Sequence, residues 1–154
     1  MPNIVLTRID NRLVHGQVGV TWTKTFNVNL LLVANDKAST DPLAQSLMSS
    51  VSKSSGVGIR FFSLEHTANV IHKAADRQMI FIVVETPADA RKLVELGVPI
   101  KSINIGNMHF SKGKHQISKK VYVDDTDLQD FEYLKSQGIE LYIQDVPGDS
   151  KEVI

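Results

Sequence analysis

The sequence predicts an α/β fold, with one domain built on an open, mostly parallel sheet of about seven strands and with helices on both faces. Short runs of β-branched residues alternate with stretches that carry apolar residues at helical spacing. Several of these runs are apolar almost throughout, which is typical of parallel strands covered on both faces. No change of composition, linker or internal repeat divides the 154 residues, so we expect one domain over 1–154.

The elements are expected in the following order. Strands are predicted over 4–9, 29–34, 58–62, 79–84, 102–106, 119–123 and 140–143, and helices over 17–25, 41–53, 64–75, 87–95 and 127–137. Thr86 before Pro87 indicates a helix start, while Gly97 and Gly138 indicate helix ends. The polar tail from Pro147 to Ile154 is expected to fray.

Composition narrows the classes of function. The chain has no cysteine, which excludes a thiol nucleophile, a disulfide and a cysteine-based zinc site. Lys and Arg number 17 and so do Asp and Glu, so the net charge gives no argument for a nucleic-acid partner. No apolar stretch approaches the roughly 20 residues of a membrane span, and the first residues do not form a signal peptide. We therefore expect a cytoplasmic protein.

The segment between the first strand and the first helix is the candidate site. It places Arg8, Asp10, Arg12 and His15 in one turn at the carboxyl end of a strand, where open α/β sheets bind ligands. Backbone amides at the start of the following helix, at Gly16 and Gln17, favour anions. The residue types and their position indicate a site for a phosphoryl group.

Each side chain has a chemical role in this hypothesis. The imidazole of His15 is largely unprotonated near neutral pH and can accept a phosphoryl group. Asp10 can orient the ring by accepting a hydrogen bond from the nitrogen that does not react. Arg12 and Arg8 can bind the phosphoryl oxygens with a planar guanidinium.

Further polar residues follow other strands of the same sheet. Asn35 and Asp36 end the second predicted strand, and Asn107 and His109 follow the strand over 102–106. Because parallel strands share their carboxyl edge, these four residues are expected on the rim around His15. Lys112 and Lys114 follow in the same loop and are available to an acidic partner or a phosphate.

Several known motifs are absent from the sequence. It contains no Walker A loop, no Gly-x-Gly-x-x-Gly turn, no His-Glu-x-x-His pair and no Gly-x-Ser-x-Gly elbow. We therefore expect no cofactor and no metal, and a phosphoryl group on His15 would have to come from another molecule.

Two other classes remain open from the residues alone. One is a flavodoxin-like module that binds a phosphate or nucleotide without a covalent phosphohistidine. The other is a receiver domain with an aspartate acceptor, which needs two adjacent acidic residues after its first strand. Here Asp10 is followed by Asn11, which disfavours the receiver.

The run over 8–18, Arg-Ile-Asp-Asn-Arg-Leu-Val-His-Gly-Gln-Val, resembles the active-site signature of a known family. The family is the IIB component of the mannose/fructose/sorbose type of bacterial phosphotransferase system (PTS). The resemblance extends to Trp22 and to residues 33–36, 104–110 and 138–147. Residues 34–36, 74–78 and 107–109 are most similar to the branch specific for N-acetylgalactosamine and galactosamine.

The resemblance implies a fold and a function. The fold is an open α/β sheet of mostly parallel strands. The function is a phosphate relay, in which His15 reacts through Nδ1 with a phosphohistidine of a IIA component. The phosphate then passes to a sugar, N-acetylgalactosamine or a related sugar, at the membrane components IIC and IID. A cytoplasmic protein that associates peripherally with this permease is implied.

Overall fold

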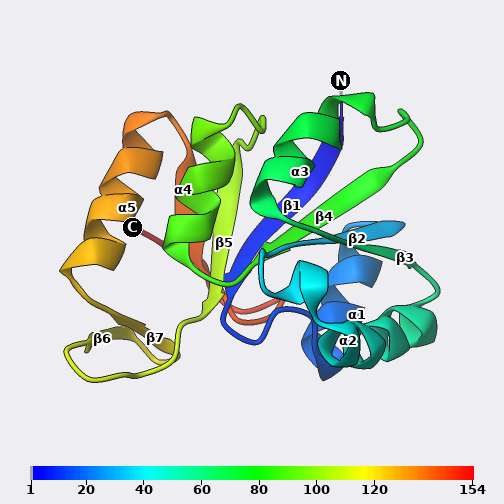
Figure 1. Ribbon diagram of the computed structural model, residues 1–154. Coiled ribbons are helices and arrows are strands. Elements are labelled where there is room, and N and C mark those ends of the chain that lie inside the picture. Colours follow the sequence, from blue (N-terminus) through cyan, green and yellow to red (C-terminus); the bar gives the residue numbers. More distant parts are fainter. Residues whose placement is uncertain (1) are drawn as a thin grey trace.

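The computed structural model describes residues 2–154, except for the side chains of residues 17–19. The described chain forms a seven-stranded sheet in the order β3-β2-β4-β1-β5-β8-β9, with a separate two-stranded ribbon, β6-β7 (Figure 1). All neighbours in the large sheet are parallel except β8 and β9. The predicted open, mostly parallel α/β sheet is confirmed.

The bounds of the elements are as follows. The strands are β1 (Asn3–Asp10), β2 (Leu30–Ala34), β3 (Gly58–Phe62), β4 (Met79–Val84), β5 (Ser102–Asn107), β6 (His115–Ser118), β7 (Val121–Val123), β8 (Glu140–Ile143) and β9 (Glu152–Val153). The helices are α1 (Gly16–Thr25), α2 (Pro42–Ser55), α3 (Leu64–Val70), α4 (Pro87–Glu95) and α5 (Asp125–Ser136), with short 3₁₀ turns η1 (Ala38–Thr40) and η2 (Ile71–Lys73).

Helices cover both faces of the sheet. Trp22 of α1 and Met48 of α2 pack with one set of strand side chains. Leu64 of α3, Leu93 of α4 and Phe131 of α5 belong to the second and larger apolar cluster. Figure 1 shows the two helix groups apart from each other, as these clusters require. None of the helices between residues 2 and 154 combines the length and the apolar character needed to cross a bilayer.

Two expectations about the sheet were wrong. The segment 119–123 does not join the large sheet, because it forms the ribbon β6-β7, whose Val121 and Val123 are buried against the core. The seventh strand is instead β9, in the tail that was expected to fray. Its backbone pairs with β8, and Ile154 packs against the core. A polar sequence can form this strand because the pairing covers the edge of β8 through main-chain hydrogen bonds.

Two helix ends also differ from the prediction. The helix expected over 64–75 ends at Val70 and continues as the tighter turn η2. The last helix begins at Asp125, two residues earlier than expected, because Asp124 and Asp127 form a capping box around its first turn. Neither change moves a predicted site residue.

The order of the strands places a switch point beside β1. The chain leaves β1 through α1 towards β2, and later crosses through α4 from β4 to β5 on the other side of β1. Crevices that bind ligands in such sheets lie where the connections diverge. The carboxyl ends of β1 and β5 flank this point in the lower centre of Figure 1.

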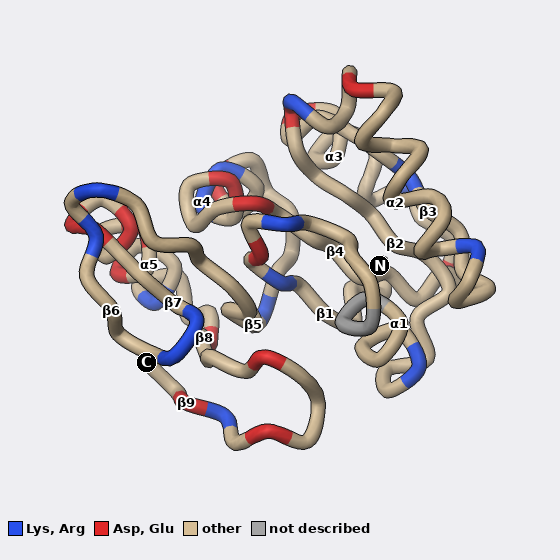
Figure 2. Tube along the Cα trace, turned by 90° about the horizontal axis from the view of Figure 1, so that it is seen from below, with Lys and Arg blue, Asp and Glu red and all other residues tan. Residues whose placement is uncertain are grey.

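The pairing of β1 with β5 is irregular at the same place. Ile9 pairs with Ile105, whereas Asp10 pairs with Asn107, so Gly106 is an extra residue in β5. Such a bulge bends a strand and turns its side chains, often next to a functional site. Basic and acidic residues are otherwise interspersed along the trace (Figure 2).

A partly buried carboxylate lies at the carboxyl edge of β2 and β4. Asp89, in the first turn of α4, accepts a hydrogen bond at 3.4 Å from the side chain of Asn35. Burial, followed by the negative charge of Glu85, raises the pKa of Asp89 to about 6. The native state therefore keeps a proton on Asp89 at pH values where the unfolded chain has already lost it.

This shift predicts a dependence of stability on pH. Because the native pKa is raised, the free energy of unfolding falls as the pH rises between the ordinary value of 3.8 and about 6. Asp89→Asn removes this loss, so we expect the variant to gain stability relative to the natural protein at about pH 7.5 and less at about pH 5. Urea unfolding at both pH values measures the difference in the free energy of unfolding between the variant and the natural protein. Asp76→Asn, at an exposed position, is the control for the loss of one negative charge. An equal gain at both pH values would contradict the prediction.

Candidate active site

The carboxylate of Asp10 is the centre of the predicted site. Asp10 is the last residue of β1 and is fully buried. Its Oδ1 accepts a hydrogen bond from the Arg12 backbone amide at 2.9 Å, and its carbonyl accepts one from the amide of Leu13 at 3.0 Å. Leu13 has φ of 59°, a left-handed conformation that a non-glycine residue rarely adopts. Asp10 therefore fixes the turn that leads to His15.

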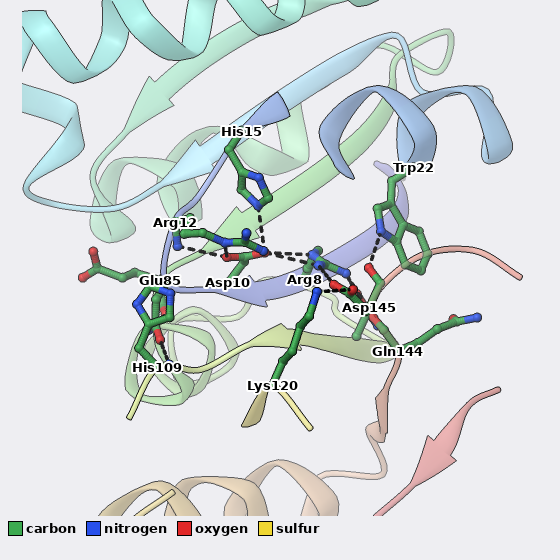
Figure 3. A network of polar contacts seen from close by, with 12 residues as sticks. Arg8, Asp10, Arg12, His15, Trp22, Glu85, His109, Lys120, Gln144 and Asp145 are labelled. Carbon is green, nitrogen blue, oxygen red and sulfur yellow. Dashed lines mark hydrogen bonds and ion pairs between the residues drawn. The ribbon is translucent and has the colours of Figure 1, made fainter. Parts of the chain in front are cut away.

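His15 lies at the start of α1 with its ring directed at Asp10. It is the N-cap residue in extended conformation, and its side chain does not cap the helix. Its Nε2 lies 3.2 Å from Asp10 Oδ2, as drawn in Figure 3, and a quarter of the side chain is exposed. The described part of the chain provides no hydrogen-bond partner for Nδ1.

The charge state of Asp10 determines the tautomer of His15. Burial alone would raise the pKa of Asp10, but hydrogen bonds from His15 and the Arg12 amide, together with the charge of Arg8, lower it to about 2. An ionised carboxylate only accepts hydrogen bonds. Nε2 of His15 therefore carries the hydrogen, and in the neutral ring Nδ1 carries the lone pair.

Arg12 lies on the solvent side of Asp10. Its Nε donates to Asp10 Oδ1 at 3.3 Å and its Nη2 to Oδ2 at 3.5 Å, while 37% of the side chain remains exposed. The guanidinium is thus held near His15 but is accessible. This position agrees with the predicted role of Arg12 towards an anion.

Arg8 lies beneath the site and does not face it. Only 2% of the residue is exposed, and Nε and Nη2 both donate to Asp10 Oδ2, at 3.3 and 3.2 Å. Its Nη1 donates to Asn104 Oδ1 at 2.6 Å and to the Gln144 carbonyl at 3.1 Å. The expectation that Arg8 binds phosphoryl oxygens is not supported by this arrangement, since its donors already point at protein acceptors. Arg8 instead balances the buried charge of Asp10.

Gly106 provides the space that Arg8 occupies. A Cβ at Gly106 would overlap the Arg8 guanidinium, because that group lies where a side chain of the bulge residue would project. On another side, Arg8 lies 5.3 Å from the centre of the Trp22 ring. Arg8 can therefore contact Asp10 in this position only because Gly106 has no side chain.

The loop after β8 completes the frame around Arg8. Asp145 lies 3.8 Å from Arg8 and forms an ion pair with Lys120 at 2.6 Å (Figure 3). The backbone carbonyl of Asp145 accepts a hydrogen bond from the Trp22 indole at 3.2 Å. The network thus connects β1, α1, the ribbon β6-β7 and the loop after β8.

The rim formed by Asn107 and His109 is joined to the His15 loop through Asn11. The Asn11 amide donates to the Asn107 carbonyl at 3.0 Å, and the Asn11 side chain donates to the Glu85 carbonyl at 2.9 Å. The His109 amide donates to the side chain of Asn11. Hydrogen bonds of Asn11 thus join the loop that carries His15 to the segment of Asn107 and His109, although the described contacts do not include one between the His109 and His15 rings.

The remaining predicted residues are placed as follows. The side chain of Asn35 accepts a hydrogen bond from the Ala38 amide at 2.8 Å, and the side chain of Asp36 accepts one from the Leu64 amide at 2.9 Å. Both residues thus hold loops at the same edge of the sheet, and the described structure shows no contact between either of them and His15. Gly16 begins α1 with φ of 28° and is exposed. The side chain of Gln17 lies outside the described residues. Lys114 forms an ion pair with Asp127 at 2.8 Å.

Sequence reasoning missed four residues of the frame, which are Asn11, Asn104, Gly106 and Asp145. Asn104 and Gly106 interrupt an otherwise apolar strand, and a polar residue or a glycine at a buried position is a signal of special packing. No signal in the sequence connects Asp145 to Arg8, because the two residues are far apart along the chain.

Comparisons with known proteins agree with this geometry. The family model described as PTS system sorbose subfamily IIB component matches residues 4–154. The chain is 59% identical over 153 residues to the N-acetylgalactosamine-specific phosphotransferase enzyme IIB component 1 of Escherichia coli (strain K12), covering 99% of this chain and 97% of that protein. The crystal structure of PTS system N-acetylgalactosamine-specific IIB component 1 from Escherichia coli matches with a TM-score of 0.97 and 58% identity, over 99% of each chain.

A relative with a different architecture also matches. The PTS system mannose-specific EIIAB component of Escherichia coli (strain K12) is 37% identical over 151 residues, which are 96% of this chain and 46% of that longer protein. These relatives do not favour a flavodoxin-like binding module. The resemblance inferred from residues 8–18 is confirmed, and the chain belongs to the sorbose subfamily of PTS IIB components, a family of sugar-specific phosphotransferase subunits.

Proposed function

We propose that His15 accepts a phosphoryl group from a phosphohistidine of a IIA component and transfers it to a sugar, as a protein-phosphohistidine–sugar phosphotransferase. The observation that carries the proposal is the contact of His15 Nε2 with the ionised Asp10, at 3.2 Å. It leaves the lone pair of Nδ1 as the nucleophile. Nδ1 is also the nitrogen that the resemblance to the family implied.

Asp10 stabilises the positive charge that develops on the His15 ring during the transfer. As Nδ1 forms a bond with phosphorus, the bond between phosphorus and the donor imidazole breaks, and the electron pair returns to the donor nitrogen. Positive charge develops on the His15 ring, and the carboxylate of Asp10 next to Nε2–H stabilises it. In the second transfer a sugar hydroxyl oxygen attacks the phosphorus and its proton passes to the surrounding water. The bond between phosphorus and Nδ1 breaks, and its electron pair returns to Nδ1 of His15.

Arg12 and the start of α1 bind the phosphoryl oxygens. The transition state of phosphoryl transfer spreads negative charge over the equatorial oxygens. The exposed guanidinium of Arg12 and the backbone amides at the start of α1, which as first-turn amides have no partner within a helix, are donors for that charge. Arg8 contributes indirectly, because it holds the carboxylate that orients the ring.

The partners follow from the family. The donor is a IIA component, and the acceptor is a sugar at membrane components IIC and IID. The names of the most similar relatives support N-acetylgalactosamine or a related amino sugar. The protein then works in the cytoplasm, in peripheral contact with the permease.

Replacement of His15 tests the acceptor. We expect His15→Ala to take up no phosphate from phosphorylated IIA, because the nucleophile is lost, and His109→Ala to take it up like the natural protein. Phosphorus NMR and intact mass measure the acid-labile phosphate. Uptake by His15→Ala, or its loss in His109→Ala alone, would show that another residue is the acceptor.

Replacement of Arg12 tests the binding of the phosphoryl group. Arg12→Lys keeps the charge but loses the planar fork, so we expect transfer from IIA to slow by about tenfold with unchanged unfolding. Arg60→Lys, at an exposed arginine of β3, is the control. Single-turnover rates measure the effect, and equal rates for the two variants would leave Arg12 without this role.

Replacement of Gly106 tests the positioning of the ring. In Gly106→Ala the new methyl group displaces Arg8, so we expect transfer to fall by about tenfold to a hundredfold. Nitrogen NMR of the His15 ring should show that the Nε2–H tautomer is no longer dominant. Gly58→Ala is the matched control, because its Cβ would make only ordinary contacts, at 3.5 Å from Leu30 and 3.6 Å from the Asn29 carbonyl. A natural tautomer and rate in Gly106→Ala would refute the argument.

A further inference from the structure

An apolar hollow lies directly beside His15. It has a volume of about 420 Å³ and lies between the loop over 12–16 and helix α2. Its walls are Arg12, Leu13, Val14, His15 and Gly16 from the loop, and Ala44, Leu47, Met48 and Val51 from α2. The hollow therefore shares His15, Gly16 and Arg12 with the proposed site of transfer.

Helix α2 extends the apolar surface into the solvent. Leu43 is 72% exposed and Leu47 is 65% exposed, and the two lie one helical turn apart on the same side of α2. We name Leu13, Leu43, Leu47 and the hollow between them the leucine surface. Single exposed leucines are common, but Leu47 lines the apolar hollow and Leu43 lies one helical turn from Leu47, so the two extend the apolar surface of the hollow.

Helix α2 carries almost no charge, and its uncharged polar residues are Gln45 and six serines. From Pro42 to Ser55 its only charged residue is Lys53, in the last turn. Helices that face water normally carry charged residues on their outer side. The centres of protein interfaces, in contrast, are depleted of charged residues and enriched in apolar ones.

We infer that the leucine surface is the docking site of the IIA phosphate donor, and this inference rests on the proposed function of His15. A donor phosphohistidine must bring its phosphorus to within roughly 3.5 Å of His15 Nδ1. A protein that does so also covers the adjoining hollow, because His15 and Gly16 are part of its wall. Exclusion of water there protects the phosphoryl group from hydrolysis.

The architecture of a relative supports IIA as the occupant. The mannose-specific EIIAB component joins a segment similar to this whole chain with a further part of comparable length in one polypeptide, and its name assigns IIA and IIB to that polypeptide. The surface on the other side of His15 is different in character, since it carries the polar rim of Asn11, Asn107 and His109. The apolar side is therefore the one that gains more free energy when a protein partner covers it.

The experiment separates docking from chemistry at His15. The double variant Leu43→Ser with Leu47→Ser removes two apolar side chains without touching the catalytic residues. We expect kcat/KM for phosphate uptake from phosphorylated IIA to fall by about tenfold or more, mainly through KM. Uptake from phosphoramidate, a small donor that needs no docking surface, should keep the rate of the natural protein.

The control is the double variant Leu96→Ser with Leu128→Ser. These leucines are also exposed, at 42% and 37%, but belong to the α4 and α5 side of the sheet. We expect the control to match the natural protein with both donors.

Four outcomes would overturn the inference. The first is an unchanged kcat/KM with phosphorylated IIA, and the second is an equal loss in the control variant. The third is a loss confined to transfer onto sugar at the membrane components, which would assign the surface to the permease. The fourth is that the natural protein forms a dimer, that the variant does not, and that the kinetics with phosphorylated IIA are the same for both. This result would assign the surface to a second copy of the chain. Failure of the proposed function itself would appear differently, as no phosphorylation of His15 in the natural protein by either donor.

Discussion

The contact between Arg8 and Asp10 is the interaction on which the rest of the site depends. Both residues are almost completely buried, and an unpaired charge in the interior would be strongly destabilising. Two donors of Arg8 reach Asp10 Oδ2 and compensate its charge, and together with the hydrogen bonds from His15 and the Arg12 amide they keep the carboxylate ionised. An ionised Asp10 in turn holds the Nε2 edge of His15. The nitrogen that we propose to react is therefore set by an ion pair that is almost completely buried.

The fold provides the conditions for this ion pair. The bulge between β1 and β5 inserts Gly106 opposite the turn from Ile9 to Asp10, and the missing side chain leaves room for the guanidinium. Asn104 of β5 and the Gln144 carbonyl after β8 then accept hydrogen bonds from Nη1 of Arg8, and Asp145 adds a negative charge at 3.8 Å. Rigid support of this kind keeps a reacting group in place without movement during the reaction.

The two sides of His15 have different surfaces, which suits the proposed exchange of phosphate with two partners in turn. The side towards β5 is tied by hydrogen bonds of Asn11 to the loops after β4 and β5. The side towards α2 is apolar and is built by Leu13 and the outer leucines of the helix. The strained backbone of Leu13 is part of the turn that presents both sides, since φ of 59° directs its side chain towards the apolar cluster that includes Met48.

The sequence by itself determined the α/β class and most strands and helices, because local periodicity and end signals record them. It also determined that Asp10, Arg12 and His15 follow one another in a short segment after β1, so that their side chains lie near one another in the fold. The tertiary structure decided that Arg8 is a buried support and that Gly106 and Asp145 belong to the same network, because these contacts join distant segments. It also decided that the polar tail forms β9, since a strand at an edge depends on backbone pairing with a neighbour and not on its own side chains.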